Sequence, residues 1–446
     1  MFKKEFQSET VQRLKRTEMY RLSALDADVQ AKDKKNETEP VDSLIQPFVQ
    51  FKNVFKRFGA NPVLKGVNLR IFKGEITTII GKSGIGKTVL LKHIIGLLEP
   101  DSGEIWLNGR PLNAMKNSEK IRLWKKFSYM FQDGALFDSM TVYKNIAFPL
   151  EQGAKVPRSE IKKRVKAKIQ LLDLSGAEDK YPGELSGGMK RRVAMARALV
   201  TDPEVVLFDE PTAGLDPIRK NAIHSMIADY QNKFRFTAVL ISHEIPDIFF
   251  FSQRIAMLDD GRIRFEGSPE EIRQSDDPIV RQFIKGVEKP HDPLTGMATQ
   301  LQGERRYMEA LARLQRHQII FSVIILTVEN SDEINEKIGH KLGQNLLKNF
   351  AEQIQQRLRI TDSCARYSLN KFLVVLHDAD INQARKFCER LAAELKVEDL
   401  LETTFLQNLN ILIGAGFSEA EENSPIKDIL FKAEMKDSSY FAFFLK

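Results

Sequence analysis

"ITTIIGKSGIGKTVLLKHI", residues 76–94, is the stretch that decides the fold. An apolar run opens it, a glycine-rich segment follows, and a helical pattern closes it, which indicates a strand, a loop and a helix. Residues 81–88 match the pattern G-x-x-x-x-G-K-[ST], whose backbone cradles phosphate groups. The stretch therefore predicts an α/β domain with a nucleotide phosphate site after its first buried strand.

The residue types of this loop suit phosphate chemistry. The glycines allow backbone N–H groups to approach phosphate oxygens closely, and the helix N-terminus adds a positive dipole. Lys87 would reach the β- and γ-phosphates, and Thr88 would ligate Mg²⁺. A chance glycine-rich turn is not expected to match this eight-residue pattern between a strand and a helix. The predicted nucleotide-binding loop consists of Gly81, Lys82, Ser83, Gly84, Ile85, Gly86, Lys87 and Thr88.

A second acidic segment, "EVVLFDEP" at residues 204–211, complements the loop. Four apolar residues form a predicted buried strand that ends on two adjacent acids. Asp209 suits a carboxylate ligand of Mg²⁺, and Glu210 suits the base that orients and activates an attacking water. An acidic strand end alone would be unremarkable, but together with the loop it predicts nucleotide hydrolysis.

Between these two motifs lies "LSGGMKRRVAMARAL", which starts at Leu185 and offers a hydroxyl and backbone amides at a predicted helix start. In this order and spacing, residues 49–286 resemble the ABC transporter ATPases, with Met189 at the last position of their LSGGQ signature. The resemblance implies a RecA-like α/β core with antiparallel β and helical subdomains, and ATP and Mg²⁺ as cofactors. It also implies a dimer, in which Ser186, Gly187 and Gly188 cap the ATP that a second copy of the chain holds.

Four further residues match motifs of that family in order. The resemblance implies that Gln132 in "YMFQDG" senses Mg²⁺ and the membrane subunit, and that His243 in "ISHE" contacts the γ-phosphate. Asp216 in "AGLDP" belongs to the loop that faces the second copy. Phe58 in "KRFG" stands where the family stacks an aromatic ring on adenine. Packing in the hydrophobic core is the alternative role for Phe58.

The segment "FQDGALFDSMTVYKNIAFPL", residues 131–150, narrows the resemblance to the ATPases of Mla- and Mce-type lipid transporters. "PIVRQFIKG", residues 278–286, resembles the tail of that subfamily. The resemblance implies a membrane permease, a lipid-binding substrate protein, transport of phospholipid or another lipid, and a peripheral position on the cytoplasmic face of the inner membrane. An amino-acid import ATPase would share every catalytic motif, and a soluble ABC ATPase of repair or translation remains a broader alternative.

The last third of the chain resembles the diguanylate cyclase (GGDEF) domains over residues 292–446. The resemblance rests on "DPLTGM" (292–297), "EINEKIGHKLGQNLLKNFAEQI" (333–354) and "CARYSLNKF" (364–372). The catalytic groups of that family are replaced, because Thr327 stands for the metal aspartate and "SLNKF" stands for GGDEF. Asn335 matches the guanine-contacting Asn, whereas Gln344 replaces the acid beside it. We therefore expect no cyclase activity.

Three roles are open for this C-terminal part. It could form dimers or brace the ATPase, it could sense a guanine nucleotide or cyclic di-GMP, or it could dock another protein. No RxxD motif precedes the hairpin, which weakens the cyclic di-GMP reading. The elements expected here are helices at 299–316, 342–358, 382–395 and 425–436, strands at 318–328, 407–417 and 439–445, and a hairpin at 363–377.

Composition and charge set the remaining bounds. We expect a charged and flexible extension at 1–48, the ATPase domain at 49–286, and the GGDEF-like domain at 287–446. One amphipathic helix is expected near the start of the extension. The net charge of +7 comes from dispersed side chains without interleaved aromatic residues, so no nucleic-acid partner is expected. The two cysteines suit a reducing compartment. The absence of a long apolar run predicts no transmembrane helix, so membrane contact would be indirect through the permease.

Overall fold

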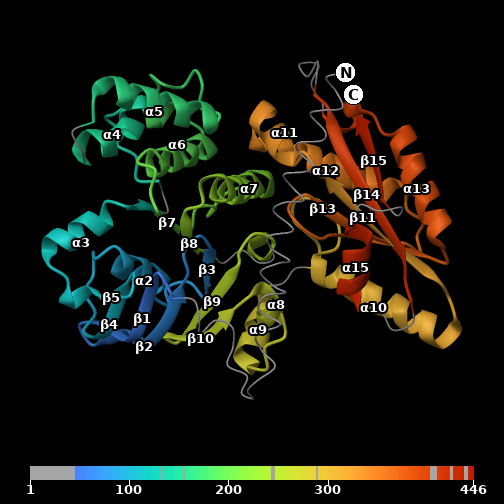
Figure 1. The fold of residues 1–446 in the computed structure, drawn as a ribbon, viewed down its shortest axis with the longest axis horizontal. Coiled ribbons are helices and arrows are strands. Elements are labelled where there is room, and N and C mark those ends of the chain that lie inside the picture. Colours follow the sequence, from blue (N-terminus) through green and yellow to red (C-terminus); the bar gives the residue numbers. More distant parts are fainter. Residues whose placement is uncertain are drawn as a thin grey trace, which may run out of the picture. The chain divides into compact units, whose positions relative to one another are not determined.

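The computed structural model describes residues 46–131, 134–153, 156–242, 247–287, 290–401, 409–421, 425–435 and 440–445. The amphipathic helix expected near the N-terminus lies outside the described residues. Residues 47–446 form one compact unit, whose elements are shown in Figure 1. In the described part of the chain, none of the helices combines the length and the apolar character that crossing a bilayer requires.

A six-stranded sheet carries the nucleotide motifs. Its order is β10-β9-β3-β8-β7-β6, in which all neighbours are parallel except the antiparallel pair β10–β9. The apolar runs that the sequence analysis singled out are completely buried strands, as expected for a sheet covered on both faces. The strands are β3 (Ile76–Ile80), β6 (Phe127–Met130), β7 (Val205–Asp209), β8 (Thr237–Ile241), β9 (Arg254–Asp259) and β10 (Arg262–Gly267).

A smaller antiparallel sheet packs against the first helix, α2 (Lys87–Ile94), and one face of the six-stranded sheet. Its order is β2-β1-β4-β5, and the shared core contains residues from both sheets and from α2. This sheet is the antiparallel subdomain that the resemblance implied. The strands are β1 (Val49–Phe58), β2 (Asn61–Ile71), β4 (Ser102–Leu107) and β5 (Arg110–Pro111).

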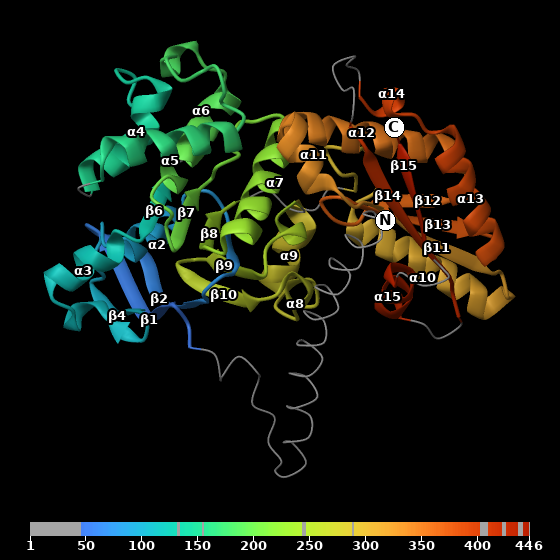
Figure 2. The same cartoon turned by 45° about the horizontal axis from the view of Figure 1, so that its top comes forward.

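Helices cover the other face of the six-stranded sheet and form a helical subdomain. Figures 1 and 2 both show α4, α5 and α6 together, drawn in green, with α7 between them and the C-terminal part. These helices share one hydrophobic core with strands β6, β7 and β8. The helices of this core are α4 (Val142–Gly153), α5 (Arg158–Leu171), α6 (Gly187–Leu199), α7 (Pro217–Phe234), α8 (Pro269–Arg273) and α9 (Pro278–Val287). Helix α3 (Asn117–Trp124) packs instead through Leu123 on the core of the smaller sheet. Short 3-10 turns lie at Leu112–Ala114, Pro182–Glu184 and Asp247–Phe250.

The C-terminal part is built on a five-stranded antiparallel sheet of order β12-β13-β11-β14-β15. Helices α11 to α14 pack on one face and helices α10 and α15 on the other. The strands are β11 (Phe321–Val328), β12 (Ser363–Arg366), β13 (Lys371–His377), β14 (Ile411–Glu419) and β15 (Tyr440–Leu445). The helices are α10 (Gln300–His317), α11 (Ser331–Ile338), α12 (His340–Arg357), α13 (Ile381–Glu394), α14 (Val397–Leu400) and α15 (Ile426–Glu434).

The fold-class prediction is confirmed: a P-loop α/β domain with antiparallel and helical subdomains precedes a smaller α/β domain. Each helix and strand expected between residues 299 and 445 has a counterpart in the structure, including the hairpin of β12 and β13. Two short helices, α11 and α14, were not expected. The proposed boundary near residue 287 falls at the end of α9 and remains a prediction, because residues 47–446 form one unit.

Candidate functional site

The phosphate loop follows β3 and leads into α2, as the motif predicts. Gly81 has φ of +148° and Gly86 has φ of +110°, a backbone region that favours glycine. A Cβ atom on Gly81 would collide with the carbonyl oxygen of Leu258, and one on Gly86 would lie 2.7 Å from the side chain of Val63. Both glycines are therefore required by the shape of the loop, independently of any ligand.

Lys87 lies inside the loop, and its side chain is folded back onto the backbone. Its Nζ donates hydrogen bonds to the carbonyl oxygens of Gly81, at 2.8 Å, and Lys82, at 2.9 Å. Burial lowers the pKa of Lys87, while the nearby carboxylates of Glu210 and Asp209 oppose this shift. A charged group held by neutral carbonyl oxygens is well placed to exchange them for phosphate oxygens.

Asp209 is the meeting point of three elements. Its Oδ1 accepts a hydrogen bond from Thr88 Oγ1, at 3.0 Å, and its Oδ2 accepts one from Tyr129 Oη, at 2.8 Å. The structure thus brings together two of the three residues predicted to hold Mg²⁺, Thr88 and Asp209, which lie far apart in sequence. Burial and the bond to Asp209 raise the pKa of Tyr129 above its usual range, so the phenol stays a donor.

Sequence reasoning missed Tyr129. It lies in "YMFQDG", three residues before Gln132, on strand β6. Only the pairing of β6 with β7 places its hydroxyl beside Asp209. A tyrosine at the end of a predicted strand was the only indication in the sequence. The order of the strands is needed to predict that this tyrosine contacts Asp209.

Glu210 follows β7 directly and has φ of +46°, in the left-handed region. Its backbone N–H donates to the carbonyl oxygen of Ile241 at 3.2 Å. Non-glycine residues are uncommon in the left-handed region, and those that adopt it are often found at functional sites. The predicted partners Gln132 and His243 lie outside the described residues.

The signature segment begins helix α6. Ser186 caps the helix, and its Oγ accepts a hydrogen bond from the backbone N–H of Met189 at 3.3 Å. Ser186 and Gly187 are exposed and Gly188 is partly exposed. Asp216 is likewise exposed and caps α7, where its Oδ1 accepts from the N–H of Arg219 at 3.0 Å. Both predicted contact loops therefore present polar groups to solvent in the single chain.

Phe58 ends strand β1 with 48% of its surface exposed. Core packing, the alternative considered for this residue, does not describe its position. Within the loop itself, Lys82, Ser83 and Gly84 are exposed, and Ile85 is partly buried against the core that β1 shares with α2. The Nζ atom of Lys56 lies over the Phe58 ring, 5.8 Å from its centroid.

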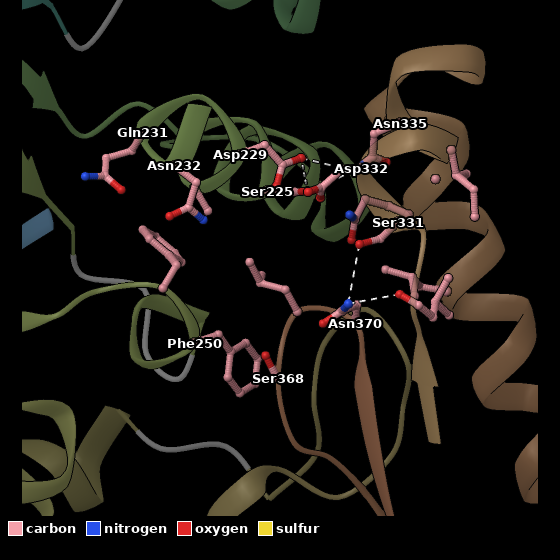
Figure 3. A pocket seen from close by; sticks show the side chains of 18 of the residues that line it. Ser225, Asp229, Gln231, Asn232, Phe250, Ser331, Asp332, Asn335, Ser368 and Asn370 are labelled. Atoms are coloured by element: carbon pink, nitrogen blue, oxygen red, sulfur yellow. Dashed lines mark hydrogen bonds between the residues drawn. The ribbon is translucent and has the colours of Figure 1, made fainter. Parts of the chain in front are cut away.

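The cyclase-like positions of the C-terminal part lie along a cavity of about 240 Å³ that α7 also lines (Figure 3). Asn370 donates through Nδ2 to the carbonyl oxygen of Val328 at 3.0 Å. Lys371 pairs in the sheet with Thr327 and forms an ion pair with Glu434 at 2.6 Å. The side chains of Asn370 and Lys371, at two positions of the cyclase motif, are therefore engaged in contacts within the domain.

This fold and this loop define a P-loop nucleotide-binding ATPase with an additional α/β domain. The ABC transporter family profile matches residues 64–213, and the profile "Diguanylate cyclase, GGDEF domain" matches residues 289–436. The chain belongs to the ABC transporter ATP-binding proteins and carries a GGDEF domain behind the ATPase domain.

Three relatives are informative. The intermembrane phospholipid transport system ATP-binding proteins MlaF of Haemophilus influenzae and Escherichia coli K12 are 37% and 36% identical to this chain. The aligned segments cover 54% and 55% of this chain and 91% and 92% of the relatives. The probable ribonucleotide transport ATP-binding protein mkl of Mycobacterium leprae is 40% identical over 53% of this chain and 69% of its own length.

Among solved structures, cbiO1 from Clostridium perfringens, part of the ABC transporter complex cbiONQ, is similar to this chain. It is 29% identical, with a TM-score of 0.48, and the match covers 54% of this chain and 95% of that chain.

Proposed function

We propose that this chain is the ATP-hydrolysing subunit of a membrane transporter that moves phospholipid, or another lipid, between bacterial membranes. The observation that carries the proposal is the 36–37% identity to phospholipid transport ATPases over nine tenths of their length. Residues 131–150 support the proposal, because their sequence resembles the lipid transport ATPases more than other members of the family. The relative mkl is named for ribonucleotide transport, so the cargo must be identified directly.

In this proposal the chain's own groups bind and activate ATP. Backbone N–H groups of residues 81–88 and the Lys87 ammonium bind the phosphates, and Phe58 stacks on the adenine. Glu210 accepts the proton of the attacking water, and His243 contacts the γ-phosphate. Lys87 leaves the carbonyl oxygens of Gly81 and Lys82 when phosphate oxygens replace them.

The residues present suit Mg²⁺. Thr88 Oγ1 and Asp209 Oδ1 are 3.0 Å apart, and both are hard oxygen ligands of the kind that Mg²⁺ prefers. Thr88, Asp209 and Gln132 would hold the ion. When bound, Mg²⁺ supplies positive charge that stabilises negative charge on the phosphates.

Three partners follow from the proposal. A second copy of the chain would contribute Ser186, Gly187, Gly188 and Asp216, which are accessible in the single chain. A membrane permease would contact the segment 132–150 and hold the ATPase at the cytoplasmic face of the inner membrane. A lipid-binding substrate protein would complete the transporter, with no nucleic acid involved.

The experiment for the cargo is purification of the chain from detergent-solubilised membranes of its host, followed by mass spectrometry of proteins and lipids. Recovery of a polytopic permease with bound phospholipid is the expected result. Recovery of an amino-acid or nucleotide permease would correct the cargo, and a soluble pool without a membrane partner would contradict the transporter assignment.

Glu210→Gln tests the hydrolytic role. Because the amide keeps the size of the side chain but cannot accept the proton, we expect ATP turnover to fall by about 10²-fold or more. ATP binding, measured with a fluorescent analogue, should stay close to that of the unmodified chain. Glu204→Gln, at the other end of β7 and paired with Lys126 on the surface, is the matched control. Near-normal turnover in Glu210→Gln would contradict the assignment.

We further propose that the GGDEF domain makes no cyclic di-GMP. Thr327 and Asn370 replace carboxylates, and Lys371 is held by Glu434, so the site lacks the acidic ligands that Mg²⁺ requires. Incubation of the full chain with GTP and Mg²⁺, followed by mass spectrometry, should show no cyclic di-GMP above a no-protein blank. A GTP-dependent product would contradict the proposal.

A further inference from the structure

Helix α7 of the ATPase meets the C-terminal domain where a cyclase would hold its nucleotide. Asn335, on α11, donates through Nδ2 to Asp229 Oδ2 at 3.2 Å and to Ser225 Oγ at 3.4 Å. His340 Nε2 lies 3.1 Å from the same Asp229 oxygen. Figure 3 shows Ser225 and Asp229 of α7 facing Asn335 across the rim of the cavity. One carboxylate of the ATPase thus engages two side chains of the cyclase-like surface.

Arg366 makes a second connection, next to the former GGDEF motif. Its guanidinium is completely buried and bonds Asn221 Oδ1, on α7, at 2.8 Å and Asp292 Oδ2 at 3.2 Å. It also lies over the ring of Phe250 at 5.3 Å. A buried charge is tolerated only with its partners in place, and here they come from both parts of the chain.

The third connection reaches the signature subdomain. The carboxylate of Asp173 accepts a hydrogen bond from the backbone N–H of His340, and Arg192 of helix α6 lies 3.7 Å from it. Gly339 packs so closely here that a Cβ atom would lie 2.7 Å from Asp173 Oδ2. The start of α12 therefore touches the loop before the signature helix and α7 at once.

The residues that line this cavity are poorly suited to bind a guanine nucleotide. Among the described residues that line the cavity, none is Lys or Arg, whereas Asp229 and Asp332 both line it. Burial and the neighbouring charge of Asp229 raise the pKa of Asp332, which shows how poorly the cavity accommodates negative charge. Phosphate groups would add further negative charge, and the Asn335 amide is already occupied by Asp229.

We infer that the former nucleotide face of the GGDEF domain is a docking socket for the ATPase of the same chain, which holds α7 and the loop before the signature helix together. The socket consists of Asn335, Gly339, His340 and Arg366. This assigns the C-terminal domain a partner within the chain and makes it a brace between two ATPase subdomains. The inference does not depend on which cargo is transported.

The test uses the full chain with a protease site inserted between Val287 and Pro290. After cleavage, the two fragments of the unmodified chain should co-elute in size-exclusion chromatography. Asn335→Asp places a second carboxylate against Asp229, and Asp229→Lys places a cation against Asn335 and His340. Each single variant should reduce the co-eluting fraction by about tenfold or more.

The double variant Asn335→Asp with Asp229→Lys should restore co-elution, because opposite charges then face each other. Such rescue separates a lost contact from misfolding. Glu336→Gln is the control, because its ion pair with Lys233 also joins the two parts but is 62% and 50% exposed. Co-elution of both single variants at the unmodified level, or release of the unmodified fragment by GTP or cyclic di-GMP, would overturn the inference.

Discussion

At the scale of single residues, Asp209 illustrates how the ATP site is prepared before a ligand arrives. One carboxylate oxygen is oriented by Thr88 and the other by Tyr129, so the group has little rotational freedom. A ligand held in place by two donors loses less entropy when it binds a metal ion. Tyr129 therefore acts on the metal site through Asp209, as a positioning residue.

Tyr129→Phe tests this role. The variant removes one hydrogen bond to a charged group, a loss of about 1.5–3 kcal/mol, while the ring remains in place. We expect the Mg²⁺ concentration for half-maximal ATPase activity to rise by about tenfold, with a smaller effect on the rate at saturating Mg²⁺. A Mg²⁺ titration of ATPase activity measures both quantities.

Tyr143→Phe, on helix α4 and away from Asp209, serves as the matched control. Thermal unfolding should show that both variants are folded at the temperature of the assay. An unchanged Mg²⁺ dependence in Tyr129→Phe would show that Thr88 alone positions Asp209. An equal change in Tyr143→Phe would show that the effect is not local.

At the scale of elements, the segment before α4 is held by hydrogen bonds from two helices, α4 and α6. Asn145 is completely buried and accepts a hydrogen bond from the backbone N–H of Phe137 at 2.8 Å, while its amide donates to the carbonyl oxygens of Phe137, Met140 and Thr141. Arg197, on the signature helix, donates to the carbonyl oxygens of Gly134 and Ala135. Movement of this segment is therefore coupled to helix α6.

Asn145→Ala should loosen this segment. Because four hydrogen bonds of a completely buried side chain are lost, we expect the free energy of unfolding to fall by about 2–3 kcal/mol. Thermal unfolding followed by circular dichroism provides the measurement. Lys144→Ala, the exposed neighbour on α4, should change the midpoint little. Equal midpoints for the two variants would contradict the structural role of Asn145.

Individual helices and strands could be predicted from the sequence, but the contacts between them could not. The loop 81–88 and the hairpin of β12 and β13 were predictable, because local pattern and motif spacing determine them. Helix α11 was missed because it is only eight residues long, too short for a clear apolar period. Tyr129 and Arg366 were missed because their partners, Asp209 and Asn221, lie on elements that only the tertiary arrangement brings close.

At the scale of the whole molecule, the signature segment and the ATP loop belong to one chain, yet Ser186 and Asp216 present their polar groups to solvent. A second chain is needed if these groups are to contact ATP. Association of two chains in the presence of ATP is therefore the property that tests whether these motifs form a working ATPase.

Glu210→Gln with Mg²⁺ and ATP should form a dimer, because ATP that is not hydrolysed keeps both faces together. Light scattering should show the mass doubling from the 51.0 kDa of the single chain. Adding Ser186→Arg, which places a large cation in the signature loop, should prevent this. A variant that binds ATP but stays at the mass of one chain would contradict the proposed second copy, and a dimer without ATP would indicate association through another surface.

Three of the α7 residues that contact the C-terminal domain, Asn221, Ser225 and Asp229, follow one another at intervals of four along a single stripe of the helix. This stripe has an evolutionary consequence. Chains that carry the same gene fusion should retain small or acidic polar residues at these positions together with Asn335 and Arg366. Unfused ATPases have no reason to retain them, so the stripe should serve as a sequence mark by which fused and unfused lineages can be told apart.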